Sequence, residues 1–210
     1  GKSLYMDGFS TKIKMNDYEA PTNKLTVSCW VAPRGFENID KYGGTAAGHP
    51  RMTALFDYGN MEEQEGFLFG YGRLGLWGLQ MNLHNNETGE NVFVGFYDPI
   101  NTLPLYEWSH IAATFDGDLG YICLTFNGEV SYEAILPDLV NTEIVPSYDE
   151  PLYFAYYSSP IYEFGIARQS PSGLVDEVEI YHDSFTPRDL KSLFKTLTNF
   201  TIIVDRKSTR

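Results

Sequence analysis

The sequence has few cysteines and few basic residues. Its 210 residues include two cysteines, Cys29 and Cys123, and 15 lysine and arginine residues against 28 aspartate and glutamate residues. Two cysteines are too few for a disulfide framework, and both lie within strand-like stretches, so we expect free, buried thiols. The formal net charge of −13 argues against nucleic acids and membranes as partners, because both require a basic surface.

Long apolar runs and familiar catalytic motifs are also missing. No window of the sequence is long and apolar enough to span a bilayer. The sequence contains no nucleophile elbow, HExxH motif, phosphate-binding loop or cysteine–histidine motif. The four histidines are far apart in sequence. These absences leave no obvious catalytic centre.

The stretch from Trp108 to Val130 predicts a β-hairpin followed by a third strand. Apolar residues alternate with others through 111–115 and again through 122–126, which is the period of a strand with two different faces. Between these runs lies Asp116-Gly117-Asp118-Leu119-Gly120, whose glycines supply the positive φ of a tight reversal. Asn127-Gly128 marks the next turn. The central part of the chain is therefore expected to form an antiparallel meander.

Other strand-like runs cover most of the chain, and one helix follows them. The helix is expected after Thr186, a suitable N-cap, because Pro187 suits the first helical position and apolar residues recur at helical spacing from Leu190 to Leu197. We predict a single all-β domain over residues 1–200, with 201–210 as a linker or tail. The long loop 36–50 is a candidate functional rim. Residues 3–15 are expected to form a first pair of strands with a turn at 7–10, and the remaining strands are expected at 25–31, 53–58, 67–71, 75–83, 92–97, 152–157, 163–167 and 173–181.

Three motifs resemble the laminin-G-like jelly rolls of the concanavalin-A-like lectin/glucanase superfamily. The central motif is the Trp108–Val130 stretch, with Ser109-His110 and Phe126-Asn127-Gly128 within it. The first motif is Leu4-Tyr5-Met6-Asp7-Gly8 together with 25–31, and the last is 173–181. The resemblance spans nearly the whole chain. It implies a two-sheet antiparallel jelly-roll sandwich with one short C-terminal helix.

A narrower resemblance concerns the runs 72–80 and 103–108. They are similar to the laminin-G-like modules that precede the catalytic domain in some glycoside hydrolase family 32 enzymes, which act on fructosides such as levan and inulin. The Asn-Asp-Pro and Arg-Asp-Pro type motifs of that catalytic domain do not occur here. The resemblance therefore implies a non-catalytic accessory module, with any catalysis in an adjacent domain outside this chain.

Sugar-binding residues are expected where aromatic and polar side chains are dense. Aromatic faces stack on the C–H surfaces of sugars, while carboxylates, amides and guanidinium groups bond the hydroxyls. The alternative for each residue is that it belongs to the core or to a sheet surface. The candidates are Trp77, Gln80, Tyr148, Tyr156, Tyr157, Tyr162, Glu163 and Arg168.

One structural calcium ion is also considered. Asp176 is expected to share a strand face with apolar residues, and a buried charge needs a partner or a metal. Many jelly rolls of this superfamily hold calcium with oxygens from the first and last strands, so Asp7 and Asp176 are the candidate ligands, with backbone carbonyls completing the site. Alternatively, Asp176 accepts hydrogen bonds from the backbone or a tryptophan.

A glucanase-type acid pair has to be weighed as well. If the strand is regular, Glu177 and Glu179 project from one face, as a retaining acid and nucleophile would. The glucanase motif has a third acid two positions before the central aspartate, and Leu174 stands there instead. We therefore expect two solvated glutamates and no enzyme activity.

The sequence thus predicts a lectin-like module that binds a neutral oligosaccharide or polysaccharide, with β-fructan the first to test. The alternative is a structural or protein-interaction domain that packs on a neighbouring catalytic domain without binding sugar. An extracellular or cell-surface location is slightly favoured.

Overall fold

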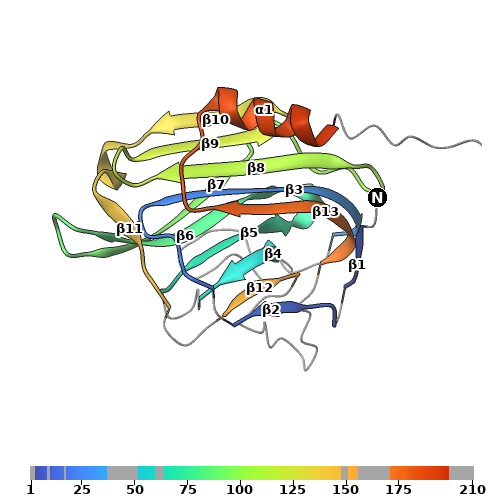
Figure 1. Ribbon diagram of the computed structural model, residues 1–210, viewed down its shortest axis with the longest axis horizontal. Helices are drawn as coiled ribbons and strands as arrows, with labels where there is room; N and C mark the ends of the chain where they lie inside the picture. Colours follow the sequence, from blue (N-terminus) through green and yellow to red (C-terminus); the bar gives the residue numbers. More distant parts are fainter. Residues whose placement is uncertain are drawn as a thin grey trace, which may run out of the picture.

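The fold is a sandwich of two antiparallel β-sheets with one helix on its outside (Figure 1). The structure, a computed structural model, describes residues 3–8, 10–16, 18–36, 52–59, 64–147, 151–155 and 171–198. Short 3₁₀ turns lie at Arg73–Gly75 and Pro137–Leu139. The strands are β1 (Leu4–Asp7), β2 (Ile13–Met15), β3 (Lys24–Gly35), β4 (Met52–Tyr58), β5 (Phe67–Gly72), β6 (Trp77–Asn85), β7 (Asn91–Tyr97), β8 (Ser109–Asp116), β9 (Tyr121–Phe126), β10 (Glu129–Ile135), β11 (Thr142–Ile144), β12 (Leu152–Phe154) and β13 (Ser172–Tyr181), and the helix is α1 (Pro187–Thr198).

The two sheets interleave distant parts of the chain. The six-stranded sheet has the order β1-β13-β3-β8-β9-β10. The seven-stranded sheet has the order β11-β6-β5-β4-β12-β2, with β7 paired to β6. This arrangement confirms the predicted antiparallel sandwich. In the described part of the chain, no helix has the length and apolar composition needed to cross a bilayer.

The predicted central hairpin is present as β8 and β9. Ile111 pairs with Phe126 and Asp116 with Tyr121, so the reversal falls on the expected turn. The Asp116 carboxylate, 4% exposed, stabilises that turn by accepting a hydrogen bond of 3.0 Å from the backbone N–H of Asp118. It also accepts a bond of 2.7 Å from the Ser184 hydroxyl, which ties the turn to the segment before α1.

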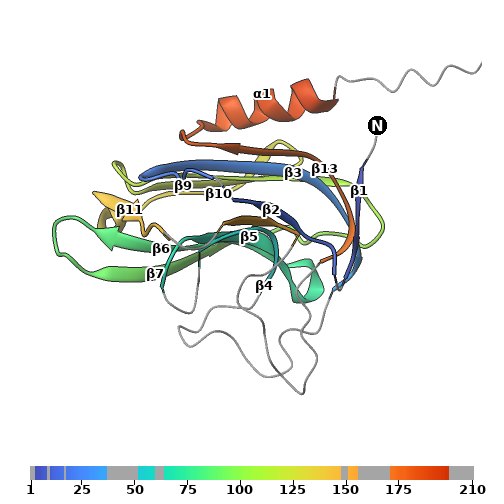
Figure 2. The same ribbon diagram turned by 60° about the horizontal axis from the view of Figure 1, so that its bottom comes forward.

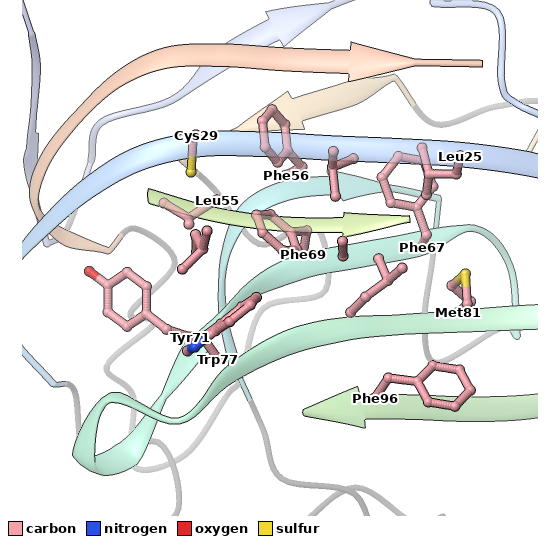
Figure 3. Packing of buried hydrophobic residues seen from close by; sticks show 14 of the residues in the cluster. Leu25, Cys29, Leu55, Phe56, Phe67, Phe69, Tyr71, Trp77, Met81 and Phe96 are labelled. Atoms are coloured by element: carbon pink, nitrogen blue, oxygen red, sulfur yellow. The ribbon is translucent and has the colours of Figure 1, made fainter. Parts of the chain in front are cut away.

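The core lies between the sheets and is built from alternate residues of each strand. Figure 3 shows aromatic rings from the seven-stranded sheet packed beneath Leu25 and Cys29 of β3. Trp77 stacks at a tilt on Phe126 across the sandwich, with 6.4 Å between ring centroids. Both cysteines are free and buried, as predicted, and burial raises the pKa of the Cys123 thiol to about 11.

The helix α1 covers part of the outer face of the six-stranded sheet (Figure 2). It begins where predicted, because the Thr186 side chain and the Asp189 carboxylate bond each other and each other's backbone N–H groups. Leu190 is fully buried against Ala112 and Cys123. Phe194 packs against Trp30, with 5.7 Å between ring centroids.

The strand β13 contains a bulge that the sequence pattern did not predict. Asp176 pairs with Trp30 and Glu179 with Ser28, so two residues of β13 oppose one of β3. Glu177 in the bulge has a φ of 48°. Because of the extra residue, positions 175 and 180 both contribute to the core although an odd number of steps separates them.

Candidate functional site

Trp77, predicted to bind sugar, is buried in the core between the two sheets and has no exposed face for a ligand. Its side chain is 0% exposed and packs edge-on against Phe69 in the core, with 6.2 Å between ring centroids (Figure 3). Trp77 and Gln80 were both predicted to bind sugar, but they stand three positions apart on one strand, which places them on opposite faces of the sheet. Trp77 is therefore a core residue.

Gln80 lies on the outer face of the seven-stranded sheet in a row of polar side chains. Its Nε2 donates a hydrogen bond of 2.8 Å to the Tyr97 hydroxyl, and burial raises the pKa of Tyr97 to about 12. Asn82, two residues further on, donates through Nδ2 to the Glu65 carbonyl oxygen at 3.1 Å. Gln80 is 3% exposed and Asn82 is 1% exposed. These amides hold the sheet face together, and a ligand could reach them only after a rearrangement.

The other predicted sugar-binding residues cannot be placed. They fall outside the part of the chain that the structure describes, as does most of the long loop 36–50. Their role stays a prediction. They are Tyr148, Tyr156, Tyr157, Tyr162, Glu163 and Arg168.

The two predicted calcium ligands are not brought together. Asp7 pairs with Ser172, whereas Asp176 lies one residue beyond Val175, which pairs with Leu4. Four strand positions, about 13 Å, therefore separate them, and calcium–oxygen distances are only about 2.3–2.6 Å. The Asp7 carboxylate instead accepts local bonds from the N–H and hydroxyl of Ser10. Asp176 accepts the N–H of Glu177 at 3.0 Å, so the expectation that it accepts backbone bonds is met.

A calcium ion shared by Asp7 and Asp176 therefore does not fit this structure. Within the described residues, no group of three or more histidine, cysteine, aspartate or glutamate side chains could hold a metal. Calcium elsewhere in the chain stays a prediction, and it can be checked by melting the protein in chelator and again after calcium is restored. A calcium-dependent rise in melting temperature, absent with magnesium at equal ionic strength, would support it.

The glutamates considered as an acid pair are separated by the β13 bulge. Glu179 stands opposite Ser28, whereas Glu177 is the extra residue and is exposed. The expectation that both project from one face of a regular strand was wrong, because the bulge interrupts the alternation. The geometry thus gives no support to a retaining pair.

The structure reveals an exposed aromatic surface that was not among the predicted binding residues. Tyr106 is 72% exposed, Tyr5 is 52% exposed and Trp108 is 42% exposed. With Arg34 they form what we call the aromatic platform. Its residues come from β1, from the end of β3 and from the loop before β8.

Strand pairing explains why these residues lie on the same end of the six-stranded sheet. Tyr5 pairs with Leu174, and Leu174 pairs with Ala32. On the other side of β3, Ser109 pairs with Val31, and the next position along each strand places Trp108 beside Ala32. Tyr5 and Trp108 therefore lie on either side of Leu174 and Ala32, whose side chains are smaller.

The other two residues of the platform are also placed by β3: Tyr106 is hydrogen-bonded to it, and Arg34 is part of it. The Tyr106 N–H donates a bond of 2.7 Å to the Pro33 carbonyl oxygen, and its φ is 65°, a conformation that non-glycine residues rarely adopt. The Arg34 guanidinium carbon lies 5.2 Å from the Tyr5 ring centroid, a cation–π distance. The one sequence signal for this surface is the run 103–108, which carries two of its aromatic residues and part of the family resemblance.

The aromatic platform offers stacking faces, donors and acceptors together. Arg34 carries N–H donors, and Glu107, which is exposed and lies between Tyr106 and Trp108 in the sequence, carries acceptors. These are the groups that a sugar ring needs on its apolar face and on its hydroxyl rim. Among the described residues, no other group of exposed aromatic side chains of this size occurs.

Comparison with known proteins identifies the family. Residues 7–191 match the Laminin_G_3 family model, whose description is the concanavalin A-like lectin/glucanases superfamily. Since this match spans most of the chain, the protein belongs to that family. No sequence match was found among the curated proteins.

Solved structures share the fold at low sequence identity. Domain 4 of AbnA, an extracellular GH43 arabinanase from Geobacillus stearothermophilus, solved with arabinotriose, is 16% identical with a TM-score of 0.57, covering 92% of this chain and 76% of that chain. The SAP-like pentraxin of Limulus polyphemus is 15% identical with a TM-score of 0.55, covering 91% and 81%. Domains LG4-5 of the mouse laminin alpha1 chain are 10% identical with a TM-score of 0.55, covering 88% and 43%. These likenesses concern the fold alone.

Proposed function

We propose that this protein is a non-catalytic, lectin-like module that binds a neutral glycan through the aromatic platform. The observation that carries the proposal is the exposure of three large aromatic side chains on one end of the six-stranded sheet, beside Arg34. Exposed tryptophan and tyrosine are unfavourable in water, so a surface that gathers them is expected to be covered by a ligand. Family membership supports a lectin-like role for that surface.

The chemistry of the aromatic platform favours an uncharged sugar. Stacking on Trp108 or Tyr106 requires only the C–H face of a pyranose or furanose ring. Arg34 and Glu107 together add one positive and one negative group, so neither a strongly anionic nor a cationic glycan is selected. The net charge of −13 does not oppose a neutral ligand, because such a ligand experiences no net electrostatic force.

The ligand class and the context of the module are finer proposals. We propose β-fructans, such as levan and inulin, and attachment to a glycoside hydrolase, on the basis of the resemblance in the runs 72–80 and 103–108. The similar fold of domain 4 of an extracellular arabinanase, solved with arabinotriose, supports a role beside a catalytic domain. The platform residues Tyr106 and Trp108 fall within the second of the two runs.

Titration calorimetry against levan, inulin, fructose and a panel of glucans and galactans tests this function. Affinity for one member is expected on the order of micromolar to millimolar, because contacts are few and water competes for each hydroxyl. Tyr106→Ala and Trp108→Ala should each weaken binding about tenfold without lowering the melting temperature. Ile135→Ala, at a 68% exposed position on β10, is the matched control and should bind normally.

If calorimetry detects no binding to any sugar of the panel, the result favours the alternative, a domain that packs on a neighbouring protein. The loop before β8, which carries Tyr106 and Trp108, also exposes Ile100, at 74%, and Leu105, at 40%. An apolar surface of this kind suits a protein interface as well as a sugar. Binding that survives both Tyr106→Ala and Trp108→Ala would instead move the glycan site away from the platform.

A further inference from the structure

A cavity lies at the open side of the sandwich, where β1 and β2 are the outermost strands of their sheets. It has a volume of about 510 Å³ and is lined from both sheets. We call it the edge groove. Its apolar lining includes Leu4, Val178 and Ile180 from the six-stranded sheet and Ile13, Met15 and Phe154 from the seven-stranded sheet.

The edge groove is separate from the aromatic platform. Leu4 lines the groove, whereas its neighbour Tyr5 belongs to the platform, and successive residues of a strand point to opposite faces. The two sites therefore lie on opposite sides of β1, and a test of one does not depend on the other.

The groove leaves apolar side chains in contact with water. Met15 is 50% exposed, Ile13 is 45% exposed and Val178 is 40% exposed, and they line the same cavity as buried core residues. The β13 bulge causes part of this exposure, because Val178 belongs to the inserted pair that opposes a single residue of β3. Bulges with a strained residue, here Glu177 with φ 48°, are frequent beside binding sites.

The rim and walls of the groove carry acids and aromatic rings. Among the described residues that line it, Asp176 and Glu177 are the charged ones and none is a lysine or arginine. Tyr18, Phe56 and Phe154 contribute aromatic rings to the wall. Carboxylates attract a cation, and the aromatic rings of the wall offer an apolar surface for the rest of the ligand. The combination selects positive charge attached to an apolar body.

We propose that the edge groove binds a small organic ammonium ion with an apolar body, such as an alkylammonium or arylammonium. The apolar body fills the space between the sheets against Ile13, Met15 and Val178, and the ammonium group lies at the rim beside Asp176 and Glu177. The volume is within the range of small-molecule sites, roughly 300–1,000 Å³, whereas a stable protein partner needs a much larger surface.

Three probes of similar size and different charge test the proposal. The probes are 2-phenylethylammonium, 2-phenylethanol and phenylacetate. Each is titrated into the isotope-labelled protein and followed by NMR chemical shifts at pH 8, where histidine side chains are uncharged. The ammonium ion should bind in roughly the millimolar range and about fivefold more tightly than the alcohol, with the carboxylate weakest. Chemical-shift changes should concentrate on β2 and on residues 176–180.

Two variants and two matched controls separate charge from apolar contact. Asp176→Asn combined with Glu177→Gln should remove the preference for the ammonium ion over the alcohol, whereas Asp138→Asn combined with Glu90→Gln should leave it intact. Val178→Asn should weaken the binding of both the ammonium ion and the alcohol. Val130→Asn, at a similarly exposed position of β10, should weaken the binding of neither.

Specific outcomes would overturn the proposal. Equal affinity for the three probes, or shift changes confined to other strands, would show that the groove does not select an organic cation. No binding of the ammonium ion at about 20 mM would do the same, because this concentration is well above the expected dissociation constant. The comparison of the three probes on the unmodified protein decides the matter even if a variant fails to fold.

Discussion

His110 is an ionisable side chain held in an apolar place. It is 0% exposed, and its ring lies 5.4 Å from that of Trp30 and 5.5 Å from that of Phe194, centroid to centroid. Neither ring nitrogen has a hydrogen-bond partner within the described part of the chain. Burial lowers the pKa of His110 from 6.5 to about 4. The neutral ring is therefore part of the surface on which α1 rests.

This burial predicts a loss of stability in mild acid. Between pH 6.5 and about pH 4 the unfolded chain binds a proton at this residue and the folded chain does not, so the free energy of unfolding falls as the pH is lowered. The loss should reach about 3 kcal/mol near pH 4. Denaturant unfolding at a series of pH values should show it, and His110→Phe, which keeps an aromatic ring, should show a smaller loss. If the unmodified protein and His110→Phe lose the same free energy of unfolding as the pH falls, the loss does not come from His110.

Trp77 was predicted to contact sugar, but its role is structural because its side chain is buried in the core. We expect Trp77→Ala to destabilise the fold by about 3–5 kcal/mol, because it removes a large side chain from a closed core. Denaturant titration measures this loss. Any decrease in glycan binding should then disappear once the folded fraction is taken into account. A variant with normal stability but no glycan binding would show that the core placement is wrong.

The candidate site was the part least accessible to sequence reasoning. Alternation along β6 separates Trp77 from Gln80, but only the packing of the two sheets shows which face is the core. The aromatic platform combines residues near positions 5, 34 and 106, and nothing in a linear pattern brings these together. Exposure is a property of the assembled sandwich, so Tyr106 could not be distinguished from a buried tyrosine beforehand.

Among the elements, α1 depends most clearly on a local signal. The reciprocal bonds of Thr186 and Asp189 satisfy N–H groups at the start of the helix, and the bonds from Thr186 lower the pKa of Asp189. Thr186→Ala should therefore reduce stability by about 1 kcal/mol, measured by denaturant unfolding. Ser192→Ala, on the exposed side of the same helix, should change little. Equal effects of the two changes would argue against a capping role.

Element positions were predicted well where hydrophobic period and turn chemistry agree. The hairpin of β8 and β9 and the start of α1 follow local rules. The strand β3 runs on through Pro33 to Gly35, although proline was expected to end it near residue 31. The short β11 was not predicted, because three residues carry too little periodicity. The β13 bulge escaped for another reason: it is defined by pairing with β3, not by its own sequence.

At the scale of the whole molecule, the excess of acidic residues should influence stability. With 28 acidic and 15 basic side chains, like charges repel one another in the compact state. Raising the sodium chloride concentration from about 10 mM to about 150 mM shortens the screening length from roughly 30 Å to 8 Å. The melting temperature at pH 7 should therefore rise, by about 2–4 °C if screening contributes near 1 kcal/mol. A fall would mean that attractive ion pairs, such as Lys24 with Asp116 at 3.4 Å, outweigh the repulsion.

The position of β13 in its sheet has a consequence for how the protein is made. This strand, residues 172–181, is inserted between β1 and β3, both of which the ribosome delivers long before it. Until β13 arrives, two backbone edges in the interior of the sheet lack their neighbour, and such edges invite pairing between nascent chains. Assembly must also close a long loop of chain, which places folding among the slower single domains, in milliseconds to seconds. A cell that synthesises this protein rapidly would therefore rely on chaperones during that interval, and slower synthesis or a lower temperature should raise the soluble yield.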